Sequence, residues 1–594
     1  MPHDRSAFTT LGCTLALPAL LLAVAAICPP PAAALALQQA EPDPVPAGRV
    51  PPPGPYAPGF DVRHYNIAVT LPDSGQRITG RTRIDFDRPE PRRDTLRLDF
   101  VGLRVTAVTV APADGQAEAA AYRQDDGRLF VALPASAARA DAITVDVAYD
   151  GVPDDGLIIR ENVHGARSVF ADNWPDRARF WFPSIDHPSD KATVAFEVTA
   201  QAGWEVIANG VRADGRTDAV PPSDGVWRYE VGVPVPTYTM VIGAVDFAVG
   251  VIDPCAQGGE TALHTDGCVQ VTSWTFPQDS ATGARIFSRA GDMIRHYTSL
   301  FAPFPYHKLA HVQSATRFGG MENVGAIFYS EQAIAAGTLS ETTVAHETVH
   351  QWFGDAVTEA DWSHLWLSEG FATYFGIQYF EAADGVERFR ELLDESAAGY
   401  LASDVTDLPI VDTTAVPEND LFALLNANSY NKGGQVLHML RGLLGDSAFF
   451  DGLRRYYTRA THGTALTDDL RQALEEASGL ELGRFFDQWV YSPGHPVLRV
   501  TWTWDENAAQ VAVTVEQVQK PEWPTFTMPI TVAFDTPAGE VHREGELTER
   551  ATVLRFPLDA RPTDLRIDPD GWLLEELVAP PAPAGASGAG AAGS

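Results

Sequence analysis

The sequence predicts a multidomain α+β protein in which a strand-rich region, a helix-rich region and a second strand-rich region follow one another. The chain has 594 residues, of which 45% are hydrophobic. Apolar and polar residues alternate in short runs over 61–250 and again from 496, whereas a helical period dominates 282–491. One hydrophobic core rarely serves so long a chain, so we expect roughly two to four domains.

The charge of the chain narrows the classes of partner. It carries 78 Asp and Glu against 43 Lys and Arg, a formal net charge of −35. Nucleic-acid binding relies on a basic surface that displaces counterions from the phosphates. Nucleic acid is therefore not an expected partner.

Residues 1–36 have the pattern of a signal peptide. An apolar run over 11–27 precedes an A-L-A triplet ending at Ala36, where we expect cleavage. A retained membrane anchor is the alternative, although this run is at the short limit for a span. Lipid attachment at Cys28 is weaker still, because the bulky Ile27 precedes it. We predict a secreted or periplasmic bacterial protein with no stable membrane span after cleavage.

The rest of the chain divides by composition and period. Residues 37–58 form a Pro-rich linker, and 578–594 form a disordered tail of Ala, Gly and Pro. Between them we expect an all-β domain over 59–250, a mostly helical domain over 251–494 and a β-sandwich over 495–577. Strand runs such as T-R-I-D-F at 82–86 and V-A-V-T-V at 511–515 carry the two β assignments.

Two cysteines remain once the signal peptide is removed. Cys255 and Cys268 lie 13 residues apart in a stretch rich in Gly and Asp. In an oxidising compartment a disulfide closing such a loop contributes about 3 kcal/mol. We predict this disulfide, with two isolated thiols as the alternative. A metal site here is disfavoured because only His264 lies nearby as a further ligand.

The helix-rich region contains a metal-binding motif. Residues 346–350 read H-E-T-V-H, and on a helix His346 and His350 share one face because they are four residues apart. Ser340 is a suitable N-cap for this helix, and Gly354 is suited to end it. The pair alone is also compatible with two unrelated surface histidines on an ordinary helix.

A catalytic zinc needs a third protein ligand and one open position. Glu369 is the candidate, with 18 residues separating it from His350 in the segment W-L-S-E-G. The metzincin pattern is excluded because Phe353 and Ala356 stand where it needs a glycine and a third histidine.

These motifs together resemble the M1 family of zinc aminopeptidases. H-E-x-x-H, the 18-residue gap and the glutamate belong to its pattern, as do G-G-M-E-N at 319–323 and Y-N-K-G at 430–433. The segment F-P-S-I-D-H-P at 182–188 is also similar. The resemblance implies an N-terminal β-sheet saddle domain, a thermolysin-like, mostly α catalytic domain and a C-terminal β-sandwich.

The resemblance also implies chemical roles. One Zn²⁺ per chain would be held by His346, His350 and Glu369, with Glu347 as general base and Tyr430 as oxyanion stabiliser. The substrate would be a peptide with a free N-terminus. Its binding segment would comprise Gly319, Gly320, Met321, Glu322 and Asn323, with the Glu322 carboxylate pairing with the α-ammonium and Asn323 supporting it.

One position departs from the family pattern. Members often supply a second amine-binding Glu or Gln from the first domain, about a dozen residues before Asp186. In this chain that position is Trp174. Either Asp172 or Asn173 takes over the role from a shifted loop, or Glu322 acts alone. Trp174 would then shape the pocket or belong to the core.

Three other functions compete with aminopeptidase activity. A thermolysin-like endopeptidase would use the same zinc chemistry on blocked peptides. An epoxide hydrolase acting on a lipid is known in the same family, and a catalytically silent M1-like binding scaffold would have lost the chemistry. The scaffold is disfavoured because the ligands, the base and the tyrosine are all present.

Overall fold

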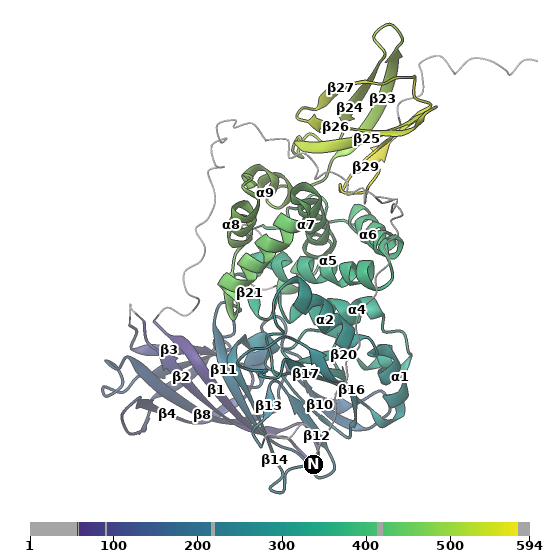
Figure 1. Cartoon of the computed structure of the whole chain (residues 1–594). Coiled ribbons are helices and arrows are strands. Elements are labelled where there is room, and N and C mark those ends of the chain that lie inside the picture. The colour runs from purple at the N-terminus through teal and green to yellow at the C-terminus, as the bar shows by residue number, and fades with distance from the viewer. Residues whose placement is uncertain (1–55, 57–58, 90–91, 215–219, 413–419, 580–594) are drawn as a thin grey trace, which may run out of the picture. The chain divides into compact units, whose positions relative to one another are not determined.

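The computed structural model describes residues 56, 59–89, 92–214, 220–412 and 420–579 (Figure 1). The predicted signal peptide lies outside the described residues, as do nearly all of the linker and the tail. The described residues form a β-rich N-terminal region, a helical region and a β-rich C-terminal region, which confirms the predicted fold class.

The N-terminal region is built on an eight-stranded sheet in the order β13-β14-β11-β1-β2-β8-β4-β5. Buried and exposed side chains alternate along β2, as expected for a sheet with one face on a core. All its pairings are antiparallel except that of β1 with β11. The strands are β1 (Asp61–Thr70), β2 (Ile78–Asp87), β4 (Arg104–Pro112), β5 (Glu118–Ala119), β8 (Ala142–Gly151), β11 (Lys191–Thr199), β13 (Val211–Arg212) and β14 (Val226–Pro236).

Two smaller sheets complete this region. One has the order β12-β15-β10-β9 and the other β3-β7-β6. Their strands are β3 (Thr95–Asp99), β6 (Tyr122–Asp125), β7 (Arg128–Ala132), β9 (Leu157–Glu161), β10 (Arg167–Ala171), β12 (Glu205–Ala208) and β15 (Ile242–Val245), with short 3₁₀ turns η1 (Ala178–Phe180) and η2 (Thr237–Thr239). The chain leaves β10 at Ala171 and reaches Trp174 three residues later.

The helical region begins with a five-stranded sheet in the order β16-β17-β18-β20-β19. Its strands are β16 (Ala248–Gln257), β17 (Cys268–Thr275), β18 (Lys308–Ser314), β19 (Gly320–Met321) and β20 (Ala326–Ser330). The last three fall inside 282–491, where the sequence indicated helices. β18 and β20 are buried on both faces, so they lack the alternation that identifies a strand. The predicted disulfide joins Cys255 to Cys268 across β16 and β17.

Helices form most of the rest of this region. They are η3 (Pro277–Asp279), α1 (Ser280–Ile286), α2 (Ala290–Leu300), α3 (Glu331–Ala335), α4 (Glu341–His350), η4 (Trp362–His364), α5 (Trp366–Ala383), α6 (Val386–Leu401), η5 (Leu421–Leu424), the π-helical turn η6 (Asn428–Lys432), α7 (Gly433–Ala460), α8 (Thr467–Ser478) and α9 (Gly483–Trp489), with β21 (Val357–Glu359) paired to β22 (Gly463–Ala465). In the part of the chain that is described, no helix is both long and apolar enough to cross a membrane.

The C-terminal region consists of two sheets, in the orders β27-β24-β23-β29 and β26-β25-β28. Val511, Val513 and Val515 of β24 are fully buried, which places the core on the face of the strand that these three residues share. The strands are β23 (Val497–Asp505), β24 (Gln510–Gln517), β25 (Met528–Thr536), β26 (Gly539–Leu547), β27 (Ala551–Pro557), β28 (Asp564–Ile567) and β29 (Glu576–Val578).

Candidate metal centre and active-site cavity

Helix α4 presents the two histidines as the sequence predicted. Its first residue follows Ser340, whose hydroxyl accepts a hydrogen bond from the Thr343 amide at 3.0 Å and caps the helix. His346 and His350 lie one turn apart on one face, and their Nε2 atoms are 3.1 Å apart. The helix ends at His350, four residues before Gly354.

Glu369 comes to the same point from the first turn of α5. Its Oε2 atom lies 3.2 Å from His346 Nε2 and 3.4 Å from His350 Nε2. Tetrahedral zinc with bonds of about 2.0–2.1 Å would hold neighbouring donor atoms about 3.3–3.4 Å apart. Two imidazole nitrogens and one carboxylate are also ligands that zinc prefers. The three residues therefore fit a zinc ion.

The other ring nitrogen of His350 is already engaged. Its Nδ1 lies 3.1 Å from the Phe353 carbonyl, to which it can donate, and 3.1 Å from Ser368 Oγ. A proton on Nδ1 leaves the Nε2 lone pair free for a metal. Gly354 makes room for this arrangement: its φ is 115°, and a Cβ there would lie 2.4 Å from Ser368 Oγ. Ser368 carries no motif letter, so the sequence did not indicate its contact with His350.

Two further carboxylates, those of Glu322 and Glu347, lie beside the candidate metal ligands. One carboxylate oxygen of each of Glu322 and Glu347 and one nitrogen of His350 lie within 4.8 Å of one another. Burial raises the pKa of Glu322 to about 7 and that of Glu347 well above its usual range. Burial alone would lower the pKa of His350, but the carboxylates of Glu322 and Glu369 outweigh it and raise that pKa to about 10. A cation bound to His350 would lower the pKa of each of these three groups.

The G-G-M-E-N segment forms the edge strand β19, which pairs with β20 through Gly320 and Met321. A Cβ at position 320 would come within 2.2 Å of Glu347 Oε1, so the glycine lets the Glu347 side chain keep this position. Residues 319–322 all line the cavity. Asn323 does not, although the sequence grouped it with them: it is buried, and neither its amide nitrogen nor its amide oxygen has a hydrogen-bond partner.

Gln351 connects the G-G-M-E-N segment to the end of helix α4. Its Nε2 donates to the Glu322 carbonyl at 2.9 Å and to Asp355 Oδ2 at 2.8 Å, while its Oε1 accepts from the Gly325 amide at 2.8 Å. The side chain is fully buried. No motif includes Gln351, and its place directly after the second motif histidine is the one signal that the sequence offers for it.

Tyr430 enters the cavity from the π-helical turn η6. Its ring lies parallel to that of His346, with an angle of 8° between the planes and 5.9 Å between the centroids. Burial and the negative charge of Glu369 raise the pKa of its hydroxyl well above the usual range. The hydroxyl therefore keeps its proton and can act as a hydrogen-bond donor.

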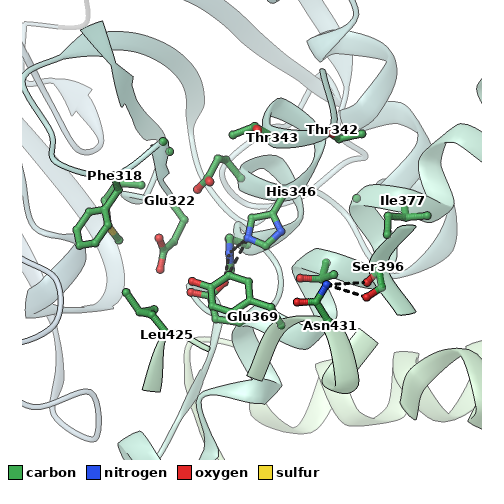
Figure 2. A pocket seen from close by; sticks show the side chains of 18 of the residues that line it. Phe318, Glu322, Thr342, Thr343, His346, Glu369, Ile377, Ser396, Leu425 and Asn431 are labelled. Atoms are coloured by element: carbon green, nitrogen blue, oxygen red, sulfur yellow. Dashed lines mark hydrogen bonds and ion pairs between the residues drawn. The ribbon is translucent and has the colours of Figure 1, made fainter. Parts of the chain in front are cut away.

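These residues surround a cavity of about 520 Å³. In Figure 2, His346 and Glu369 lie in the middle and separate two lobes. We call the side with Phe318 and Leu425 the aromatic lobe. Trp174 also belongs to it, because it lines the cavity and its ring packs against that of Phe318. The opposite side, with Ile377, Ser396 and Asn431, is the helical lobe, and Thr342 and Thr343 lie above His346 in this view.

The position that departs from the family pattern belongs to the aromatic lobe. Trp174 lines the cavity, whereas its neighbours Asp172 and Asn173 do not. Asp172 accepts hydrogen bonds from Thr316 and Arg317. The Asn173 amide donates to the carbonyls of residues 237 and 240 and accepts from the indole of residue 181. Neither side chain takes the place of a second amine ligand.

Comparison with known proteins gives two family matches. Residues 62–239 match the Peptidase M1 N-terminal domain, and 287–489 match the Peptidase family M1 domain. Together these matches cover well over half of the chain.

Several curated proteins are similar to the chain over much of its length. It is 27% identical to the puromycin-sensitive aminopeptidase of Caenorhabditis elegans over 526 residues, which are 82% of this chain and 53% of that protein. It is 26% identical to aminopeptidase N of Streptomyces lividans over 495 residues, 77% of this chain and 53% of that protein. Probable aminopeptidase 1 of Sulfurisphaera tokodaii is 26% identical over 429 residues, 68% of this chain and 50% of that protein.

The chain spans about half the length of the curated relatives it matches. Both family matches nevertheless fall in the expected order, and the second includes H-E-T-V-H, Glu369 and Tyr430. The chain belongs to peptidase family M1.

Proposed function

We propose that the protein is a zinc aminopeptidase that removes the first residue of peptides with a free N-terminus. The observation that carries this proposal is the convergence of two groups on one cavity. The first is a zinc-compatible set of donors, His346, His350 and Glu369, 3.1 to 3.4 Å apart. The second is a buried pair of carboxylates, Glu322 and Glu347, directly beside it.

Glu347 has the position and surroundings of a general base. Zinc bound at this centre would acidify a water molecule and polarise the scissile carbonyl. The Glu347 carboxylate would accept the proton of the attacking water and pass it to the leaving amine. The absence of a Cβ at Gly320 gives its carboxylate room beside β19.

Tyr430 and Glu322 would share the remaining work. The protonated Tyr430 hydroxyl would donate to the oxygen on which negative charge develops. Glu322 would pair with the α-ammonium of the substrate, which stabilises the carboxylate form. Pairing at this point sets how far the chain enters, so that the first peptide bond lies over the metal centre.

The proposal is tested with matched amide substrates. The purified full chain is assayed with leucyl-7-amino-4-methylcoumarin, its N-acetyl form and a peptide blocked at its N-terminus. We expect hydrolysis of the free-amine substrate alone, loss of activity with a chelator and recovery with added zinc. Metal analysis is expected to find one zinc per chain.

Two other results would overturn the proposal. Cleavage of the blocked peptide at internal bonds, without release of the first residue, would make the protein an endopeptidase. If the zinc-loaded protein hydrolysed no more of any substrate than the Glu347→Gln variant does, the protein would be a binding scaffold.

We further propose that the protein acts in the periplasm or outside the cell. The N-terminal pattern over 1–36 supports export, and the Cys255–Cys268 disulfide suits an oxidising compartment. The test is expression of the full chain in a Gram-negative host, followed by mass spectrometry of the periplasmic fraction. We expect a mature N-terminus at Leu37; an uncleaved protein in the membrane fraction would contradict export by a cleaved signal peptide.

A further inference from the structure

We propose that the aromatic lobe selects substrates whose first residue is aromatic or large and aliphatic, and that Trp174 and Leu425 are specificity-determining residues. This inference rests on the proposed function, because it takes the substrate to be a peptide anchored by its α-ammonium. It adds the substrate class that the motifs leave open.

The anchor decides which lobe receives the first side chain. In an amino acid the α-ammonium, the side chain and the carbonyl carbon are attached to one Cα atom. With the ammonium at Glu322 and the carbonyl over the metal ligands, the first side chain must lie beside Glu322. Figure 2 places Glu322 on the same side as Phe318 and Leu425, so this side chain enters the aromatic lobe. The remainder of the peptide leaves along the helical lobe.

The walls of the aromatic lobe come from three segments that are distant in the sequence. Trp174 follows β10, Phe318 precedes β19, and Leu425 follows η5. The rings of Trp174 and Phe318 pack edge to face, with centroids 5.9 Å apart and an angle of 89°. An aromatic side chain of the substrate could pack against these walls edge to face or in an offset stack.

Further rings hold Trp174 in place from behind. Trp362 and Phe422 each pack against it with centroids 5.6 Å apart. Trp174 itself is only 2% exposed. A side chain held on several sides cannot turn away to admit a larger or more polar group without breaking these contacts. The floor of the lobe is therefore rigid and apolar.

The charges around the lobe disfavour a charged first residue. Among described residues that line the cavity, the carboxylates are Glu322, Glu347, Glu369 and Glu395. The first is taken up by the α-ammonium, the next two belong to the catalytic centre, and Glu395 adjoins Ser396 in the helical lobe. A basic first side chain would thus have no carboxylate of its own, and an acidic one would be repelled.

The acidic and basic groups behind the lobe are paired with one another. The guanidinium of Arg177 lies 5.9 Å from the ring centroid of Phe318 and 5.8 Å from that of Phe422. It forms ion pairs with Asp155 and Asp172. Because these charges lie behind the rings and compensate each other, they offer no partner to a charged substrate side chain.

The test compares five aminoacyl-7-amino-4-methylcoumarins, with Phe, Leu, Ala, Lys or Glu as the amino acid. Burial of a large apolar side chain favours the transition state by about 10- to 100-fold over a small one. We expect kcat/KM for Phe and Leu to exceed that for Ala by this factor, and Lys and Glu to fall below Ala. Equal values for all five, or a preference for Lys or Glu, would overturn the inference.

Two matched substitutions locate the preference. Leu425 and Ile377 are both half-buried aliphatic residues of the cavity wall, one in each lobe. In Leu425→Ala we expect the ratio of kcat/KM for Phe to that for Ala to fall about three- to tenfold. In Ile377→Ala we expect all five substrates to change by one common factor. If Ile377→Ala reduced the ratio and Leu425→Ala did not, the first side chain would occupy the helical lobe.

Trp174→Ala is expected to reduce the same ratio by about tenfold or more. Because Trp174 is buried, the thermal unfolding of the Trp174→Ala variant is also measured. If this variant does not fold, Leu425→Ala provides the test. Different results would contradict the proposed function and the proposed selectivity. If no free-amine substrate is hydrolysed, the proposed function fails; if all are hydrolysed without preference, the aromatic lobe does not select.

Discussion

The two sides of the cavity are built in different ways. The metal side comes from the helix pair α4 and α5, within the short stretch from His346 to Glu369. The aromatic lobe is assembled from Trp174, Phe318 and Leu425, three segments spread over some 250 residues of sequence. A local motif can place the candidate metal ligands because it lies on two helices that are neighbours in the sequence. Selection of the substrate depends on segments that meet only in the folded chain.

The largest expected effect comes from the metal side. Glu347→Gln keeps the shape of the side chain and removes the base, so we expect kcat to fall about 10³- to 10⁴-fold while one zinc per chain is retained. Removal of a buried carboxylate whose pKa is raised should not lower the unfolding temperature. Steady-state kinetics, metal analysis and calorimetry measure the three quantities.

Glu359→Gln is the matched control for this substitution. Glu359 is buried, its pKa is also raised well above the usual range by burial, and it does not line the cavity. We expect its kcat to stay within about threefold of the original. If kcat fell equally in both variants, the loss would come from removing a buried carboxylate in general. The metal side would then not differ from the rest of the helical region in this respect.

Tyr430→Phe should have the next largest effect. It removes one donor to the developing oxyanion and leaves the ring stacked on His346, so we expect kcat to fall about 10²- to 10³-fold with little change in KM. Tyr456→Phe, a buried tyrosine outside the cavity, serves as control. If Tyr430→Phe raised KM and left kcat unchanged, this tyrosine would be a binding residue.

Gln351 connects the end of α4 to the segment with Glu322, and its substitution tests how separate the two sides are. Gln351→Met has a similar volume but loses the hydrogen bonds to the Glu322 carbonyl and the Gly325 amide. We expect KM for free-amine substrates to rise about tenfold with kcat within about threefold, because Glu322 is less well positioned.

Gln378→Met is the control for that experiment. Gln378 is buried and hydrogen-bonded to His296, and it does not line the cavity. Both variants should lose stability by about 1–3 kcal/mol through unpaired buried groups. An unchanged KM in Gln351→Met, with the same loss of stability, would restrict Gln351 to a structural role.

The smallest effect on turnover is expected far from both sides. Replacement of Cys255 and Cys268 together by serine removes the disulfide across β16 and β17 and should cost about 3 kcal/mol of unfolding free energy. Neither residue lines the cavity, so kcat/KM at 25 °C should stay unchanged. A large loss of activity in the folded variant would show that the hairpin contributes to the site.

The features that could be predicted from the sequence are those that depend on residues close to one another in the chain. Ser340, His346 and His350 were identified because a cap and an i, i+4 pair are properties of one helix. β18 and β20 were missed because strands buried on both faces carry no alternation. Trp174 was noted only as a departure from a pattern, since nothing near it in the sequence shows that Phe318 and Leu425 surround the same cavity.

By itself the sequence determined the order of β-rich and helical regions, the candidate donor set for a metal and the pairing of the two cysteines. Each depends on periodicity or on spacing within one or two neighbouring elements. Only the tertiary structure decided that Asp172 and Asn173 are engaged elsewhere, that Gln351 supports Glu322, and that aromatic rings form one end of the cavity. The physical reason is that contacts between distant segments are set by close packing of whole elements, which no short stretch of sequence encodes.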